Sequence, residues 1–145
     1  MKPVVISEIK RLNYLTSEID SAYHEAALKL GLSDSSVMIL YTLCEHGGEC
    51  LLSDITHISG VSRQTVNSSL RKLEKSGTVI TSAVDGKLKK VCLTDSGRAM
   101  AEKTAGRIIE IENKIFGLWP KQDIEAYLEL SQRYLTMLKD QVKEL

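Results

Sequence analysis

Apolar positions recur with helical spacing over most of this chain and alternate with a period of two only near residue 80. Residues 5–30 carry apolar side chains at helical intervals, which predicts a long first helix that Gly31 ends. A second helix is predicted over 35–46, with Ser33 or Asp34 supplying the capping oxygen. The chain therefore begins with two helices.

The next segment has the spacing of a helix-turn-helix. A short strand around Cys50 and Leu51 precedes a third helix over 53–59, Gly60 makes the turn, and a fourth helix fills most of 61–77. Within that fourth helix the residues at i, i+4 and i+7 are apolar, and the opposite face is polar. The apolar stripe is Val66, Leu70 and Leu73, and the polar face is Gln64, Asn67, Ser68, Arg71 and Lys75.

A two-stranded ribbon is predicted after the fourth helix. "TVITSAV" is rich in β-branched residues, Asp85-Gly86 is a strong hairpin signal, and "LKKVCLT" supplies the return strand. One helix over 94–118 and another beginning at Pro120 end the chain. The expected fold is mostly α with a small β-wing, a winged helix-turn-helix core flanked by long amino- and carboxy-terminal helices.

The terminal helices predict a homodimer. Their apolar stripes have little of the same chain to cover them, so a second copy is expected to bury them. We therefore expect one domain over 1–145, in which 31–94 form the winged core and 1–30 and 98–145 dimerise. Two copies suit a pseudo-palindromic duplex whose half-sites lie roughly 34 Å apart.

Charge changes this picture, because the 145-residue chain is formally neutral while one segment is basic. Residues 61–90 hold seven positive and two negative side chains, a net of +5, and the remainder holds twelve and seventeen, a net of −5. Such a division steers a polyanion toward 61–90. The alternative to a phosphate-binding surface is a solvated helix face beside a charged hairpin, with no nucleic-acid partner. Low aromatic content, 5%, disfavours a stacking platform for single strands and favours duplex DNA.

Composition also bears on the compartment. No apolar run reaches the length of a membrane helix. In "MKPVVISEIKRLN" the apolar stretch before the charged residues is too short for a secretory signal. Three cysteines, an odd number, fit a reducing compartment. We expect a cytoplasmic protein with no membrane partner.

Two segments carry a resemblance to a known family. "VSRQTVNSSLRKLEKSGTVI" resembles the recognition helix and its exit in the MarR family of bacterial winged-helix transcription regulators, and "VCLTDSGRAM" resembles its second wing strand and following helix. The resemblance covers essentially the whole chain. It implies an obligate dimer, a recognition helix in the major groove, a wing in the minor groove, and repression relieved by a small ligand or by oxidation.

The resemblance and the polar helix face together name the expected DNA contacts. Gln64 or Asn67 suits adenine, and an arginine suits guanine or phosphate, each bidentate pair giving about 1–3 kcal/mol of discrimination. Ser62, Thr65 and Ser68 are expected to fix the register on the backbone. The full predicted set is Ser62, Arg63, Gln64, Thr65, Asn67, Ser68, Arg71, Lys75, Lys87 and Lys89.

The wing departs from the family pattern. Family wings usually carry D-x-R after the turn, whereas this chain has Asp85-Gly86-Lys87. Lysine keeps the charge but loses the planar fork that senses a narrow minor groove. The wing is therefore expected to add affinity more than sequence information.

An effector site is expected, by resemblance, where the dimer helices meet the winged core. A small aromatic or hydrophobic molecule is the expected ligand, and plain core packing is the alternative for every candidate residue. The candidates are Leu12, Leu15, Ile19, Met38, Tyr41 and Ile108.

The cysteines and histidines offer weaker signals. Cys44, His46 and Cys50 have soft ligand atoms, but without a CxxC pair or a fourth ligand we expect packing and no metal. Cys92 is expected to point toward the core. Some relatives sense peroxide through a cysteine in the first helix, and this chain has none there. A redox- or metal-responsive regulator stays an alternative.

No nucleophile elbow, phosphate loop or paired metal carboxylates occur in the sequence, so neither an enzyme nor a cofactor is expected. A winged-helix module that binds protein is a further alternative. Its docking face would carry an aromatic or aliphatic anchor, whereas Gln64, Asn67 and Ser68 on the face here are polar and uncharged, as base readers need.

Overall fold

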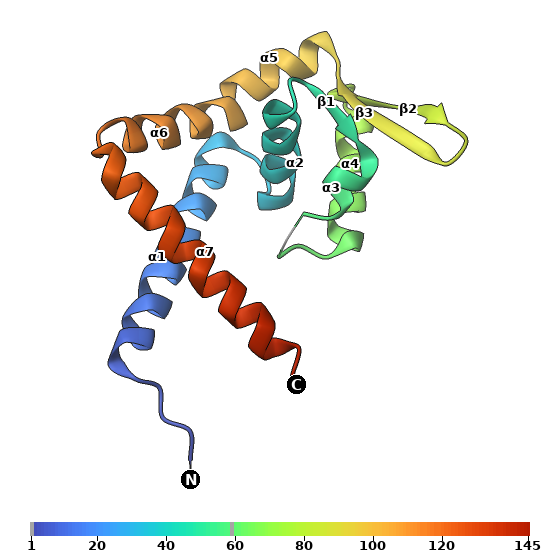
Figure 1. The fold of residues 1–145 in the computed structure, drawn as a ribbon. Coiled ribbons are helices and arrows are strands. Elements are labelled where there is room, and N and C mark those ends of the chain that lie inside the picture. Colours follow the sequence, from blue (N-terminus) through green and yellow to red (C-terminus); the bar gives the residue numbers. More distant parts are fainter. Residues whose placement is uncertain (1, 59) are drawn as a thin grey trace. The chain divides into compact units, whose positions relative to one another are not determined.

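The computed structural model describes residues 2–58 and 60–145, and its contacts divide the chain into two compact units, 1–108 and 109–145 (Figure 1). The first unit begins with helices α1 (Ser7–Leu30) and α2 (Asp34–Glu45). Gly31 takes a left-handed φ of 74° and ends α1, while the Ser33 hydroxyl oxygen accepts a hydrogen bond from the Ser36 N–H at 3.2 Å. Both predicted helix boundaries are confirmed.

The helix-turn-helix follows as predicted. Strand β1 (Glu49–Leu51) leads into the short helix α3 (Leu52–Thr56), and helix α4 (Arg63–Lys75) comes after the turn. The third helix was predicted to run to Ser59, which lies outside the described residues. The structure ends α3 at Thr56, so the observed helix is shorter than predicted.

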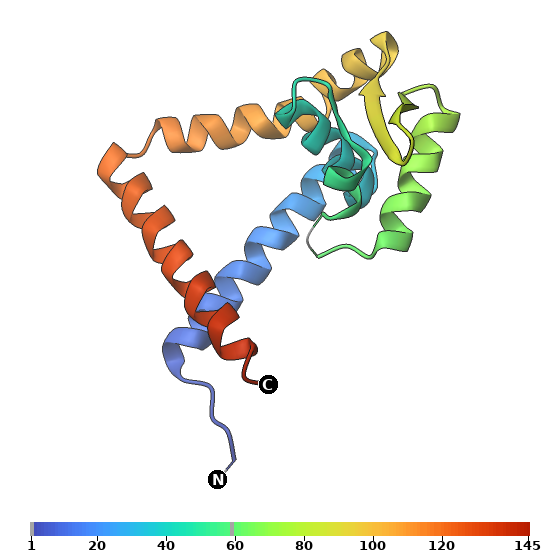
Figure 2. The ribbon, with the colours of Figure 1, turned by 45° about the vertical axis from the view of Figure 1, so that its right-hand side comes forward.

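The wing is a real antiparallel ribbon, and it is part of a three-stranded sheet. Strands β2 (Val79–Asp85) and β3 (Leu88–Leu93) pair with each other, and β1 adds to the other edge of β3, giving the order β1-β3-β2. The ribbon stands beside α4 in both views of this unit (Figure 2). The predicted mostly helical winged fold is therefore confirmed.

One predicted helix is in fact two. The segment expected to be a continuous helix over 94–118 forms α5 (Asp95–Lys103) and α6 (Ala105–Gly117), separated at Thr104. Thr104 leaves the helical region, with φ −122° and ψ −93°, and its hydroxyl donates to the Met100 carbonyl at 2.9 Å. A threonine hydroxyl that bonds the preceding turn competes with the helical ladder, which accounts for the break.

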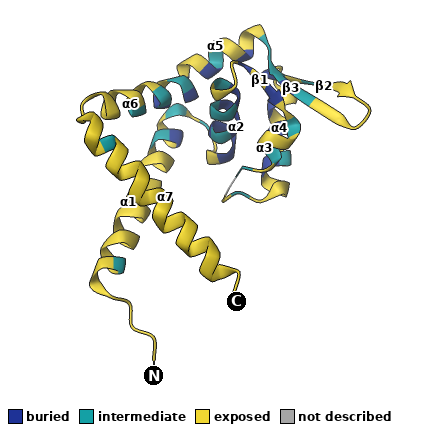
Figure 3. Cartoon of the chain, viewed as in Figure 1, coloured by how far each residue is buried: buried dark blue, intermediate teal, exposed yellow. Residues whose placement is uncertain are grey.

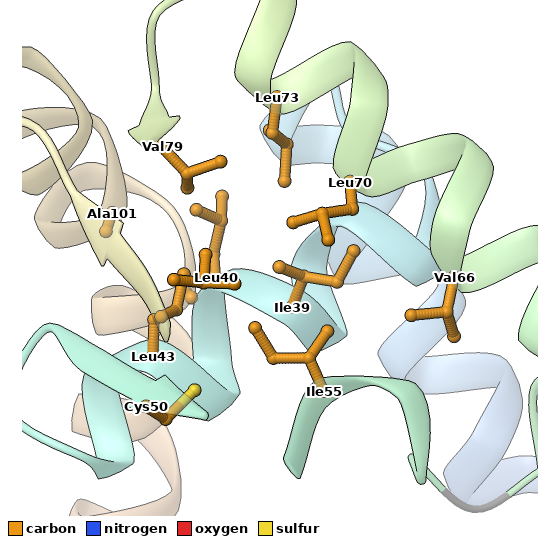
Figure 4. Packing of buried hydrophobic residues seen from close by; sticks show 12 residues of the cluster. Ile39, Leu40, Leu43, Cys50, Ile55, Val66, Leu70, Leu73, Val79 and Ala101 are labelled. Carbon is orange, nitrogen blue, oxygen red and sulfur yellow. The ribbon is translucent and has the colours of Figure 1, made fainter. Parts of the chain in front are cut away.

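The core of the first unit lies between α2, α4 and the sheet. Ile39, Leu40 and Leu43 of α2 are fully buried and meet Ile55 of α3 and Val66 of α4 (Figure 4). Fully burying an aliphatic side chain of this size contributes roughly 1.5–3 kcal/mol. The apolar stripe of α4 thereby fixes which face of that helix stays in solvent.

The second unit, 109–145, contains the rest of α6 and the helix α7 (Lys121–Val142), which begins one residue after the predicted start at Pro120. Phe116, Trp119 and Tyr127 pack as an aromatic cluster, with ring centroids 5.3–6.5 Å apart. Among the described residues, helix α7 has no buried side chain: Ile124 is half-buried and its other residues are exposed (Figure 3).

A membrane-spanning segment was not expected. No single helix among the described residues is long and apolar enough to cross a membrane, and α1 with α2 pass such a test only as a pair bent by 91°. The single domain predicted over 1–145 stays a prediction, because the two units describe contacts within one copy only.

Candidate nucleic-acid interface

Helix α4, the predicted recognition helix, has one buried and one solvent-facing side. Val66, Leu70 and Leu73 are each at most 5% exposed, which confirms the predicted apolar stripe. The solvent side carries the predicted polar residues, all exposed except the half-buried Asn67: Gln64, Asn67, Ser68, Arg71 and Lys75. Burial of the stripe holds this polar set outward, toward any partner that approaches the helix.

The start of α4 is fixed by local hydrogen bonds. The Ser62 hydroxyl oxygen accepts from the Thr65 N–H at 3.1 Å, and the two side-chain oxygens lie 2.7 Å apart. This is the capping arrangement that satisfies a free backbone donor in the first turn. Ser62 and Thr65, both predicted DNA contacts, are thus brought together and ordered at the helix end that carries the positive dipole.

The side chains of the arginines and the glutamine of α4 are available to bind a partner. Within the described residues, Arg63, Gln64 and Arg71 form no side-chain hydrogen bond or ion pair, and all three are exposed. Glu74 is the one carboxylate of the helix, and its Oε1 accepts from the Thr81 hydroxyl of β2 at 2.5 Å. Donor groups therefore face solvent while the acidic group is held against the wing.

The wing presents two lysines near its tip. Lys87 lies in the turn between β2 and β3, beside Gly86 with φ 38°, and both Lys87 and Lys89 are exposed. Lys90 is different, because its Nζ lies 3.4 Å from Oε2 of Glu49 on β1. Lys90, which added to the segment's predicted charge, is therefore partly neutralised, and Lys87 and Lys89 are the cations available at the tip.

The comparisons with known proteins bear on this core. Residues 30–88, from the end of α1 to the first residue of β3, match the model of the MarR family. The match covers 59 of the 145 residues, so the chain is similar to the MarR family over its winged core. A comparison with curated proteins finds no match.

Solved MarR-family structures share the fold. A MarR family regulator from Neisseria meningitidis, NMB1585, has a TM-score of 0.79 at 17% identity, covering 97% of this chain and 100% of that one. MepR from S. aureus in complex with DNA has a TM-score of 0.66 at 20% identity, covering 94% and 99%. NadR in complex with 4-hydroxyphenylacetate has a TM-score of 0.68 at 17% identity, covering 92% and 96%.

The predicted effector residues of this chain lie in different settings. Tyr41 and Ile108 pack in one small cluster with Ala27 and Val37, and Met38 is half-buried. Leu12, Leu15 and Ile19 of α1 are 40–49% exposed in one copy. The structure therefore brings only part of the predicted set together within the first unit, and their shared role stays a prediction.

A small cavity lies elsewhere in the first unit, at the end of α2. Its volume is about 170 Å³, and its lining includes Cys44, Gly48, Arg98 and Glu102. A methyl group on Gly48 would come within 2.8 Å of the Arg98 guanidinium, so the arginine packs directly on the glycine backbone. None of the predicted effector residues lines this cavity.

The three thiols are free, and burial disfavours the thiolate of each. Burial raises the pKa of Cys44, and burial with the nearby Asp54 carboxylate raises the pKa of Cys50 to about 11. Burial and the hydrogen bond to Glu49 raise the pKa of Cys92. No group of three or more His, Cys, Asp or Glu side chains suited to a metal ion occurs in the part of the chain that the structure describes.

The predicted direction of Cys92 is wrong. Its neighbour Val91 is the fully buried residue of β3, whereas Cys92 is half-buried and its thiol donates to Oε2 of Glu49 at 3.5 Å. Strand alternation permits either face, and the register that pairs Val91 with Cys50 decides it.

We expect slow alkylation of these thiols. At pH 8 a group with a pKa near 11 carries about 100-fold less thiolate than one at 9, so Cys50 should react very slowly with iodoacetamide. Glu49→Gln should lower the pKa of Cys92 by weakening its hydrogen bond and removing a negative charge. Mass spectrometry of each cysteine across pH 7–10 checks this, with Glu45→Gln as control. Fast reaction of wild-type Cys50 at pH 8 would contradict it.

Proposed function

We propose that this chain is a transcription regulator of the MarR type, which binds pseudo-palindromic duplex DNA as a cytoplasmic homodimer and represses transcription until a small effector releases it. One observation carries the proposal: the solvent face of α4 combines uncommitted amide and guanidinium groups above a buried apolar stripe. The structure of MepR with DNA, which shares this fold, supports the ligand class. No catalytic step and no cofactor are part of the proposal.

Base recognition falls to the exposed middle of α4 in this proposal. Gln64 and Asn67 present amides that match adenine, and Arg63 and Arg71 present planar donors that match guanine or a phosphate. Ser62, Thr65 and Ser68, with Lys75, hold the helix on the sugar-phosphate backbone. The positive end of the helix dipole at Ser62 favours a phosphate there as well.

The wing contributes charge in this proposal. Lys87 and Lys89 reach the minor groove as point charges, because lysine lacks the planar fork of arginine. A narrow minor groove concentrates negative potential and attracts such a charge. The wing therefore raises affinity for many sequences alike.

Dimerisation follows from exposed apolar surface on two separate elements. Helix α1 exposes Leu12, Leu15 and Ile19, and α7 exposes Leu128, Leu135 and other apolar residues at helical intervals. Large apolar faces of this kind are rarely left in solvent, and a two-fold copy covers both faces at once. The dimer then presents two recognition helices to half-sites roughly 34 Å apart.

Release by an effector is the least direct part of the proposal. NadR, with the same fold, is known in complex with 4-hydroxyphenylacetate, a small aromatic acid. Tyr41 and Ile108 supply an apolar wall of suitable chemistry in this chain, and the exposed α1 residues Leu12, Leu15 and Ile19 would complete it in a dimer.

A salt titration tests the electrostatic basis of the proposal. If two copies neutralise about eight phosphates, the logarithm of the affinity should fall against the logarithm of salt concentration with a slope of about −7. Lys87→Ala removes one contact per copy, so its slope should be shallower by about 2. Lys121→Ala, on a 90%-exposed side chain outside the basic segment, is the control and should leave the slope unchanged.

Fluorescence anisotropy with labelled duplexes gives both slopes. A flat salt response of the wild-type protein would exclude the proposed contact with DNA. Equal slopes for the wild-type protein and Lys87→Ala would place the wing away from the phosphates while leaving the role of α4 intact.

A further inference from the structure

A pair of buried hydroxyl groups joins the recognition helix to α2. Ser35 of α2 and Ser69 of α4 are 8% and 7% exposed, and their side-chain oxygens lie 2.5 Å apart, one donating to the other. The two helices also meet through apolar side chains, among them Ile39 of α2 and Val66 and Leu70 of α4 (Figure 4). The pair is thus a directional contact inside an interface of non-directional ones.

Such a contact constrains a helix in a way that apolar packing does not. Aliphatic side chains stay largely buried when a helix rotates or slides slightly. A buried hydroxyl that loses its partner is left without a hydrogen bond, because water cannot reach it to replace the partner. The Ser69 hydroxyl, whose partner among the described residues is Ser35, is therefore satisfied at one rotation and one axial position of α4. Neither serine was singled out by the sequence pattern.

The other end of this contact is itself anchored. Ser35 belongs to the first turn of α2, where the Ser33 oxygen caps the helix and lies 3.3 Å from the Ser35 hydroxyl. Asp34, the first residue of α2, pairs with Nδ1 of His24 on α1 at 2.9 Å. The start of α2 is thus held to α1 on one side and to α4 on the other.

The position of Ser69 links this contact to the proposed DNA face. Ser68, its neighbour, is exposed, and Asn67 and Arg71 lie two residues away on the outward side of α4. Because a helix moves as a rigid unit over two turns, a rotation that breaks the buried pair also turns these side chains. The rotation of α4 decides which side chains reach base edges.

We propose that the Ser35–Ser69 hydrogen bond positions the recognition helix for DNA. This inference rests on the proposed function and adds to it two positioning residues that touch no base. In the dimer the contact occurs twice, so it also sets how sharply the protein distinguishes the spacing of two half-sites.

Hydrogen exchange of the free protein tests the contact without DNA. The variants are Ser35→Ala, Ser69→Ala and their double, and Ser36→Ala is the matched control, a buried serine of α2 whose hydroxyl bonds only to Ser33 among the described residues. Amides of 63–75 should exchange roughly three- to ten-fold faster in each single variant than in the control. The double variant should add little to either single. Equal exchange in all four variants would overturn the inference.

Binding to two duplexes tests the link to recognition. One duplex carries the preferred half-site spacing and the other has one base pair inserted at the centre. The ratio of the two affinities should fall roughly three- to ten-fold in Ser69→Ala and stay at the wild-type value in Ser36→Ala. A lower Tm with an unchanged ratio would reduce the pair to a structural role and overturn the inference. A wild-type protein that binds no duplex would overturn the proposed function, and the exchange comparison would still decide whether the pair holds α4.

Discussion

Gly97→Ala should destabilise the protein by about 3 kcal/mol, the upper part of the range for overpacking a core. Gly97 lies in the first turn of α5, and an added methyl carbon would stand 1.8 Å from the Thr78 carbonyl oxygen and 3.1 Å from the Thr94 hydroxyl. That carbonyl accepts hydrogen bonds from the Thr94 N–H and hydroxyl, so it has no free space to move into. The helix would have to separate from the end of α4.

Gly117→Ala is the matched control for this change. Gly117 is also a helical glycine, at the end of α6, and a methyl group there meets nothing within 4 Å. Alanine is favoured over glycine in a helix by roughly 0.5–1 kcal/mol, so this variant should be neutral or slightly stabilised. Thermal unfolding at one fixed protein concentration separates the two, with Gly97→Ala lower by roughly 10 °C. Equal Tm values would mean that Thr78 and Thr94 move to accommodate the methyl group without loss of stability.

Local chemistry explains why much of the fold was predictable. Ser33, Ser62 and Thr94 each cap the helix that follows them through their own side-chain oxygen, so the signal and its effect lie within three residues. Asp85-Gly86 fixes the wing turn in the same local way. The buried stripe of α4 was predictable because helical period alone places its members on one face.

The wrong predictions depend on contacts between distant residues. Period-two alternation cannot tell which face of β3 meets the core, and pairing of Val91 with Cys50 and Thr81 settles it against Cys92. The break at Thr104 depends on its hydroxyl, which donates to the carbonyl of the preceding turn. Not every threonine in a helix forms this bond, so the sequence does not predict the break.

The candidate site shows the same division. Its solvent-facing members were predictable as a set, because exposure of Gln64 and Arg71 follows from burial of their opposite face. The Ser35–Ser69 contact was not, since a serine beside an apolar stripe has no partner until α2 is placed against α4. Likewise the pairing of Lys90 with Glu49 depends on β1 joining the sheet.

Gln64→Ala should remove base preference while leaving general affinity for DNA intact. Gln64 is exposed and has no side-chain hydrogen bond among the described residues, so the substitution should not alter stability. A lost bidentate contact costs about 1–3 kcal/mol per copy, and two copies would weaken the preferred duplex by roughly 30-fold to 10⁴-fold. Affinity for a scrambled duplex should change little, and so should the salt slope, because glutamine carries no charge.

Lys87→Ala gives the opposite pattern and serves as the contrast. Loss of the Lys87 charge should lower the affinity for preferred and scrambled duplexes by similar factors and make the salt slope shallower. A point charge on the phosphates carries no sequence information. Selection from a random duplex library by the wild-type protein supplies the preferred site, and anisotropy titrations of both variants against both duplexes then separate the two roles. If Gln64→Ala also lost affinity for scrambled DNA by the same factor, Gln64 would be a backbone contact, and base recognition would have to rest on Asn67 and the arginines of α4.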